Sequence, residues 1–245
     1  MAAPCAAPDH LTRVSGGDEC LIVKTYRGAP AGDAGTLFVL LHGNHTSGSP
    51  AVSQYPVAEE IAAKAAPGAV AVALLRPGYN DDQGNYSSGW DGRRADNFGT
   101  DIIDKVADAI VRLKAFHGAR RLVLVGHSGG AAMTGVMLGR QPGLADAGVL
   151  VACPCDVRAW RQGRSMPWGS ASAIDYVDVT PRQTRIAVIV GDRDTVTPPG
   201  LSVAYSEALQ PRGIAARLLL LPGIDHVSVI RAPEVVAEAL RLERD

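Results

Sequence analysis

The stretch VLVGHSGGAAM, residues 123–133, decides the fold of this chain. Its apolar first residues predict a buried strand, and the small residues that follow Ser128 predict a helix. Gly126 and Gly130 flank a turn so sharp that a side chain at either position would collide with neighbouring backbone. The turn exposes the hydroxyl of Ser128 and leaves the Gly129 N–H unpaired at the helix start, where it can hold a developing negative charge. The stretch therefore predicts a nucleophilic serine.

Length and composition suit one α/β domain. At 245 residues, with 47% hydrophobic residues and a net charge of -1, the chain can bury a full core and indicates neither disorder nor a nucleic-acid surface. No apolar run approaches the roughly 18 residues that a membrane-spanning helix needs. We expect residues 1–245 to form a single domain with no nucleic-acid partner and no membrane span. The sequence does not indicate an oligomeric state.

Strands and helices alternate along the chain. The alternation predicts an α/β fold, a mostly parallel sheet of about eight strands covered by helices on both faces. The first two strands, joined by Ser-Gly-Gly-Asp, form a hairpin at the sheet edge. Two connections are longer than plain crossovers: 76–97, expected to be a functional loop, and 153–185, expected to form a small cap or lid. The predicted strands are 11–14, 19–26, 36–41, 69–75, 122–125, 147–152, 186–190 and 215–221, and the predicted helices are 57–66, 100–116, 129–140, 199–209 and 233–242.

Two further loops supply the partners that a nucleophilic serine needs. A serine hydroxyl reacts only when a base accepts its proton and a carboxylate orients that base. Asp194 follows the next-to-last predicted strand and His226 follows the last. In a parallel sheet both loops lie at the same edge as Ser128, where such sheets place their ligands.

With these residues in place, the chain resembles the α/β-hydrolases over essentially its whole length, in particular the serine esterase and peptidase-like group. The order nucleophile, acid, histidine is typical of that superfamily. The resemblance implies that Ser128 is the nucleophile, His226 the base, and Asp194 the acid in the pattern Gly-x-x-Asp-x-x-x-Pro. It also implies that His-Gly-Asn, ending at Asn44, is the oxyanion segment, and that the N–H groups of Asn44 and Gly129 bind the oxyanion.

The acid has one serious competitor. Asp156 follows the preceding strand, from which some members of the superfamily supply their acid. Asp192 is interpreted as a residue that forms a turn through its own side chain. Asp225 directly precedes His226, so its side chain points away from the imidazole. We favour Asp194 and keep Asp156 as the alternative.

Several side chains are candidates for contact with a substrate. His45 follows the oxyanion segment, although a histidine on a surface loop accounts for it equally well. The aromatic candidates for the pocket wall lie on the loop 76–97 and the segment 153–185, and core packing is the alternative for any one of them. They are Tyr79, Trp90, Trp160 and Trp168.

The four cysteines fall into two pairs. A bridge between Cys5 and Cys20 would close a loop of about 15 residues and stabilise the fold by about 3 kcal/mol. Cys153 and Cys155 occupy alternate positions of an extended chain and face the same side, which favours a bridge over a redox or metal role. Zinc is disfavoured because no cysteine and histidine spacing matches a tetrahedral site. The Ala/Pro-rich start resembles a mature N-terminus left after signal removal, which favours a secreted or periplasmic protein; the alternative is a cytoplasmic protein with four reduced thiols.

The predicted activity is hydrolysis of a small-molecule carboxylic ester through an acyl-enzyme, without a metal or an organic cofactor. A peptidase, amidase or thioesterase is an alternative, because the same triad serves those reactions. A binding protein of the same fold without catalysis is the alternative from another class, and the complete triad argues against it.

Overall fold

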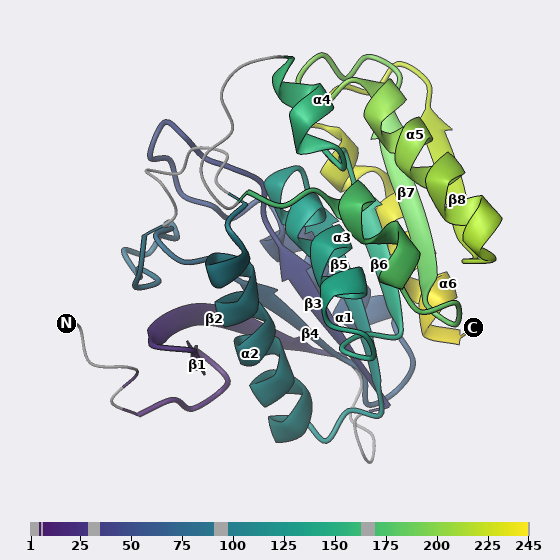
Figure 1. Ribbon diagram of the computed structural model, residues 1–245. Coiled ribbons are helices and arrows are strands. Elements are labelled where there is room, and N and C mark those ends of the chain that lie inside the picture. Colours follow the sequence, from purple (N-terminus) through teal and green to yellow (C-terminus); the bar gives the residue numbers. More distant parts are fainter. Residues whose placement is uncertain (1–4, 6, 29–34, 91–97, 163–169, 245) are drawn as a thin grey trace.

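The computed structural model describes residues 5, 7–28, 35–90, 98–162 and 170–244, and within them the strands form one sheet (Figure 1). The strand order is β1-β2-β4-β3-β5-β6-β7-β8. β1 and β2 run antiparallel to their neighbours and all other pairs are parallel, so the predicted sheet of about eight strands is confirmed. The strands are β1 (Arg13–Gly16), β2 (Glu19–Arg27), β3 (Thr36–Leu41), β4 (Val70–Leu74), β5 (Arg121–His127), β6 (Ala147–Val151), β7 (Arg185–Gly191) and β8 (Ala216–Leu221).

Helices cover both faces of the sheet (Figure 1). α1 and α6 pack on one face, and α2, α3 and α5 pack on the other. The helices are α1 (Tyr55–Lys64), α2 (Thr100–Phe116), α3 (Gly129–Arg140), α4 (Val157–Arg161), α5 (Pro199–Leu209) and α6 (Pro233–Arg244), with the 3-10 turns η1 (Ala173–Val179), η2 (Gln210–Arg212) and η3 (Val229–Arg231).

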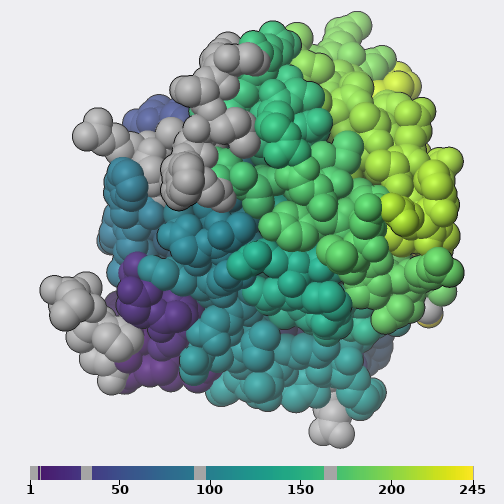
Figure 2. Space-filling view, in the orientation of Figure 1, coloured from purple at the N-terminus to yellow at the C-terminus, as the bar shows by residue number. Residues whose placement is uncertain are grey.

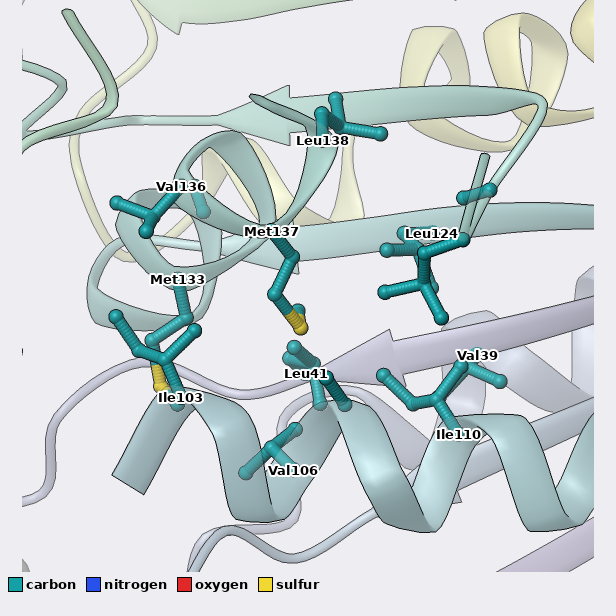
Figure 3. Close-up of a cluster of buried hydrophobic side chains, with 14 of the residues drawn as sticks. Val39, Leu41, Ile103, Val106, Ile110, Leu124, Met133, Val136, Met137 and Leu138 are labelled. Atoms are coloured by element: carbon teal, nitrogen blue, oxygen red, sulfur yellow. The ribbon is translucent and has the colours of Figure 1, made fainter. Parts of the chain in front are cut away.

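The central strands are apolar throughout because they are buried on both faces. Every residue of β3, β4 and β6 is buried. Alternate side chains of each strand therefore enter different cores: Val39 and Leu41 face α2 and α3, whereas Phe38 and Leu40 face α1 and α6. Figure 3 shows the first core, in which methionines of α3 and branched side chains of α2 meet the sheet. Two complete cores fix the carboxyl ends of the strands, where the site lies.

The ends of some elements differ from the prediction. The strand predicted over 11–14 begins only at Arg13, because the Asp9 carboxylate accepts hydrogen bonds from the N–H groups of Leu11 and Thr12 and holds them in a turn. The first predicted helix, 57–66, instead spans Tyr55–Lys64, with proline in its first turn, where a missing N–H costs nothing.

The N-terminal hairpin closes one side of the molecule. β1 packs against α2, and in the space-filling view the purple hairpin and the blue-green helix form one continuous surface (Figure 2). A disulfide joins Cys5 to Cys20 at the start of β2, with a Cα–Cα distance of 4.8 Å. The segment before the sheet is therefore tied to its edge.

The second disulfide joins Cys153 and Cys155 directly after β6. Both cysteines are fully buried. The segment 153–185 continues through α4 and η1, and η1 packs against α3, so at least this part belongs to the main body of the domain. Whether the whole segment acts as a cap stays a prediction. Within the described ranges, none of the helices is both long and apolar enough to cross a membrane.

Candidate active site

Ser128 occupies the turn between β5 and α3, in a backbone conformation that non-glycine residues rarely adopt, with φ 51° and ψ -117°. Its N–H donates to the carbonyl of Val151 on the neighbouring strand at 2.8 Å. A Cβ at Gly126 would lie 2.4 Å from the Gly130 oxygen, and one at Gly130 would lie 2.4 Å from the Leu41 oxygen. Both glycines are therefore required, and the turn holds the Ser128 hydroxyl at the end of the sheet.

His226 bridges the serine and the acid. The Ser128 hydroxyl lies 3.0 Å from His226 Nε2, and His226 Nδ1 lies 2.8 Å from Asp194 Oδ2. Asp194 comes from the loop after β7 and His226 from the loop after β8, as the chain order predicted. The Asp194 side chain has no exposed surface, and that of His226 is 12% exposed. The three groups have the hydrogen-bonded order that activates a serine.

The acid loop holds Asp194 as a carboxylate. The N–H groups of Val196 and Thr197 donate to Asp194 Oδ1 at 2.9 and 2.8 Å. Burial is the largest single effect and raises the pKa of Asp194. Hydrogen bonds from His226 and Thr197, together with the charge of His226, outweigh burial, so the pKa of Asp194 lies below its usual value. The carboxylate remains ionised at neutral pH.

Two loops meet beside Ser128. A Cβ at Gly43 would lie 3.1 Å from the Ser128 Cβ, so the segment after β3 packs directly on the turn. Gly129 is the first residue of α3, where backbone N–H groups have no acceptor within the helix. A Cβ at Gly129 would lie 2.3 Å from Asn44 Oδ1, which places the Asn44 side chain over Gly129. The residues that carry the two predicted oxyanion donors, Asn44 and Gly129, are therefore neighbours, one from each loop.

Arg76, at the start of the loop after β4, supports this arrangement. Its side chain is buried and donates to Asn44 Oδ1 at 2.7 Å and to the His42 carbonyl at 3.1 Å. Its backbone N–H donates to His42 Nε2 at 3.0 Å. The guanidinium also stacks on Tyr79, 4.9 Å from the ring centroid. Arg76 was not among the residues predicted for the site, because nothing in the sequence indicates that its guanidinium reaches Asn44.

His127 supports the histidine loop. Its Nε2–H donates to the backbone carbonyl of His226 at 2.9 Å. Burial, followed by the nearby charge of His226, lowers the pKa of His127 to about 4. His127 is therefore neutral at neutral pH, and its neutral ring keeps the proton that holds the loop.

The predicted substrate contacts lie at different depths. His45 is partly exposed directly after the predicted oxyanion segment, its Nδ1 being 3.2 Å from Ser49 Oγ, and Trp90 is 67% exposed. Trp160 is half-buried and donates its indole N–H to the Val196 carbonyl at 2.6 Å.

Tyr79 departs from the prediction that it walls the pocket. It has no exposed surface, because its ring packs under Arg76 and its hydroxyl lies 3.2 Å from the guanidinium. It supports the segment after β3, through Arg76, from behind. Trp168 lies outside the residues that the structure describes.

Asp156 has a different use from that of a catalytic acid. Its side chain accepts a hydrogen bond from the Ala159 N–H at 3.0 Å and caps the start of α4. Among the described residues, no three histidine, cysteine, aspartate or glutamate side chains gather as metal ligands do.

Comparison with known proteins gives the family. Residues 57–243 match the model of the prolyl oligopeptidase family, and the chain belongs to this family. Its fold is that of the α/β-hydrolases. Est1E from Butyrivibrio proteoclasticus, solved with bound ferulic acid, has a TM-score of 0.67 at 14% identity, covering 95% of this chain and 96% of that one.

Two other solved structures have similar folds. The Pyrococcus furiosus esterase Pf2001 has a TM-score of 0.70 at 17% identity, covering 95% of this chain and 89% of that one. Dipeptidyl peptidase 4 of Porphyromonas gingivalis has a TM-score of 0.69 at 16% identity, covering 96% of this chain and 35% of that one. The search of curated proteins found no match. Family and fold identify the chain as a hydrolase of the α/β-hydrolase superfamily.

Proposed function

We propose that this protein is a serine hydrolase that cleaves carboxylic esters through an acyl-enzyme. The observation that carries the proposal is the position of His226, within hydrogen-bond distance of both Ser128 and Asp194. Ser128 attacks the ester carbonyl carbon and His226 takes the serine proton. His226 then returns that proton to the leaving alcohol, while Asp194 holds the imidazole in the required tautomer. Hydrolysis of the acyl-enzyme by water repeats the same proton transfers.

The tetrahedral oxyanion would be held by the N–H groups of Asn44 and Gly129. Donors from two separate loops can meet one point about 3 Å from each, an arrangement that a single loop rarely provides. The close packing of the Asn44 side chain on Gly129 supports this assignment, because it holds the two loops against each other.

An ester substrate is favoured because three carboxylates on the loops at this end of the sheet already accept hydrogen bonds from backbone N–H groups. Asp192 accepts the Gly223 N–H, Asp225 accepts the N–H groups of its own loop, and Asp156 caps α4. A substrate with a free ammonium group needs a carboxylate to pair with, and it would have to share any of these three with the backbone N–H groups that the carboxylate already accepts. Exposed Val196 and Val227 flank the triad residues and suit an apolar acyl or alcohol group.

Peptide or amide hydrolysis is the second candidate, favoured by the family to which the chain belongs. Thioester hydrolysis uses the same machinery. His45, Trp90 and Trp160 are the side chains we propose for substrate contact. The two disulfides favour an oxidising compartment, so we propose that the protein is secreted or periplasmic.

A fluorophosphonate probe followed by substrate panels tests the function. Wild type should label on Ser128, and Ser128→Ala should not. Ser128→Ala and His226→Ala should each lower kcat by about 10⁴- to 10⁶-fold while leaving the fold intact. Ser206→Ala, which removes a buried hydroxyl of α5, is the matched control and should label normally.

Panels of p-nitrophenyl esters, aminoacyl anilides and acyl thioesters then separate the candidates. Faster turnover of anilides than of esters of the same acyl group would replace the ester assignment with a peptidase. Absence of labelling in folded wild type would contradict the proposed activity and favour a binding protein of the same fold without catalysis.

A further inference from the structure

Thr197 lies three residues after Asp194 and is buried directly against the triad. Its side chain has no exposed surface. The hydroxyl oxygen lies 2.8 Å from Asp194 Oδ2, 3.1 Å from His226 Nδ1 and 3.0 Å from the Ala152 carbonyl oxygen. The one hydroxyl of Thr197 is therefore within hydrogen-bond distance of two members of the proposed triad.

The single hydroxyl proton has two possible acceptors, Asp194 Oδ2 and the Ala152 carbonyl. A hydrogen bond to an ionised carboxylate is shorter and stronger than one to a neutral carbonyl, and the distance to Asp194 is the shorter of the two. With the proton on that side, each carboxylate oxygen of Asp194 accepts two hydrogen bonds. Oδ1 accepts the N–H groups of Val196 and Thr197, and Oδ2 accepts Thr197 Oγ and His226 Nδ1.

We infer that Thr197 is a positioning residue of the triad, whose hydroxyl fixes the rotation of the Asp194 carboxylate and disperses its charge beside His226. Its hydrogen bond turns one lone pair of Oδ2 towards His226 Nδ1, and this keeps Nε2 aimed at Ser128. The inference rests on the proposed function, because it assigns a role within the same proton transfer.

The hydroxyl also sets how strongly Asp194 attracts a proton onto His226. Without the donor from Thr197 the carboxylate bears its full charge next to the imidazole, which favours the imidazolium. Among the described residues, the other titratable groups close to this site include His127, whose ring lies 5.1 Å from that of His226 and which also senses the charge of His45, and Asp225 in the histidine loop. Neither contacts Thr197 through a hydrogen bond, so removal of the hydroxyl leaves both in place.

Thr197→Val tests the inference, because valine replaces the hydroxyl with a methyl group of similar size. We expect kcat/KM for a p-nitrophenyl ester to fall about 10-fold or more, as for loss of one charged hydrogen bond, with KM little changed. The acidic limb of the pH profile of kcat/KM should move to higher pH. Thr197→Ser, which keeps the hydroxyl, should restore both the rate and the limb.

Thr180→Val is the matched control. Thr180 is buried and donates its hydroxyl to the Tyr176 carbonyl at 2.9 Å, away from the triad. Thr180→Val should lower the free energy of unfolding about as much as Thr197→Val does, while keeping the wild-type rate and pH profile. If Thr197→Val does not fold, Thr197→Ala takes its place against Thr197→Ser.

The inference is overturned if Thr197→Val matches wild type, or if its rate falls without a shift of the acidic limb and serine does not restore it. Failure of the proposed function is distinct, because then wild type itself neither labels with the fluorophosphonate nor hydrolyses the ester.

Discussion

At the scale of single residues, the site depends on which carboxylate faces the histidine. Both Asp156 and Asp194 follow a strand of the same sheet, and the sequence favours Asp194 as the acid with Asp156 as the alternative. The structure places Asp194 against His226 Nδ1 and uses Asp156 to cap α4. The difference arises because Asp156 is followed by a helix whose first N–H groups need an acceptor.

Asparagine substitutions at these two positions should therefore have very different effects. Asp194→Asn keeps the shape but loses the charge that holds the imidazole, so kcat should fall by about 10⁴-fold. Asp156→Asn keeps a good capping residue and should change the free energy of unfolding by less than about 0.5 kcal/mol, with full activity. Steady-state kinetics and urea denaturation of both variants make the comparison. A larger loss of activity in Asp156→Asn would transfer the role of acid to that residue.

Prediction at this scale included Ser128, Asp194 and His226, which the structure brings together, but not the residues that support them. The glycines around Ser128 and the order of Asp194 and His226 carry strong signals in the sequence. The hydroxyl of Thr197 and the guanidinium of Arg76 carry none, because their contacts depend on how separate loops come together in three dimensions. For the same reason the sequence left open whether Tyr79 lines the pocket or packs in the core: an aromatic residue on a loop gives no sign of which way it packs.

At the scale of elements, most strands and helices follow from periodicity. The prediction for residues 100–116 matches α2, whose buried residues Ile103, Val106 and Ile110 recur at helical spacing. The predicted ends fail where side chains intervene, as at Asp9, whose carboxylate competes with strand pairing for the backbone N–H groups.

The disulfide at the first hairpin gives a prediction at this scale. The double variant Cys5→Ser/Cys20→Ser should lower the free energy of unfolding by about 3 kcal/mol, because a bridge across a separation of 15 residues restricts the unfolded chain. Activity should be unchanged, since β1 and β2 lie at the sheet edge. Chemical denaturation of both proteins without reductant measures the difference.

Intact mass with and without reductant is the control for that experiment. Wild type should lose the mass of two hydrogens per bridge relative to its reduced form. Equal stability of the variant and an oxidised wild type would show that the hairpin does not depend on the bridge.

At the scale of the whole molecule, two buried histidines make stability depend on pH. His117, held against Arg27, and His127 both have pKa values lowered to about 4, chiefly by burial. The unfolded chain therefore binds protons that the folded chain does not between about pH 6.5 and 4. The free energy of unfolding should keep its full value above this window and should fall as the pH drops through it, by about 3 kcal/mol for His127 alone.

Carboxylates act at a lower pH. Hydrogen bonds with Arg140 outweigh burial and lower the pKa of Asp104, and hydrogen bonds likewise lower that of Asp194. Their contribution is present above about pH 4 and is lost only as the pH falls through their folded values. Urea denaturation at pH 7.5, 5.5 and 4 measures the histidine window.

His117→Gln separates the two histidines, because it removes only the share of His117, which lies away from the triad. If the free energy of unfolding of wild type did not change between pH 7.5 and 4, both rings would bind protons as readily in the folded state as in the unfolded chain, which would contradict this prediction.

The contact between Gly129 and Asn44 has a consequence for how this sequence can vary. A methyl group at position 129 would meet Asn44 Oδ1 at 2.3 Å and, less closely, Arg76 Nη1 at 2.8 Å, so the Asn44 side chain is the first obstacle to a larger residue at 129. In a library that randomises both, active clones should show epistasis: alanine or a larger residue at 129 should survive only with glycine, alanine or serine at 44. Gly129→Ala alone should be nearly inactive, and Asn44→Ala should rescue it in part. Independent tolerance at the two positions would contradict this coupling.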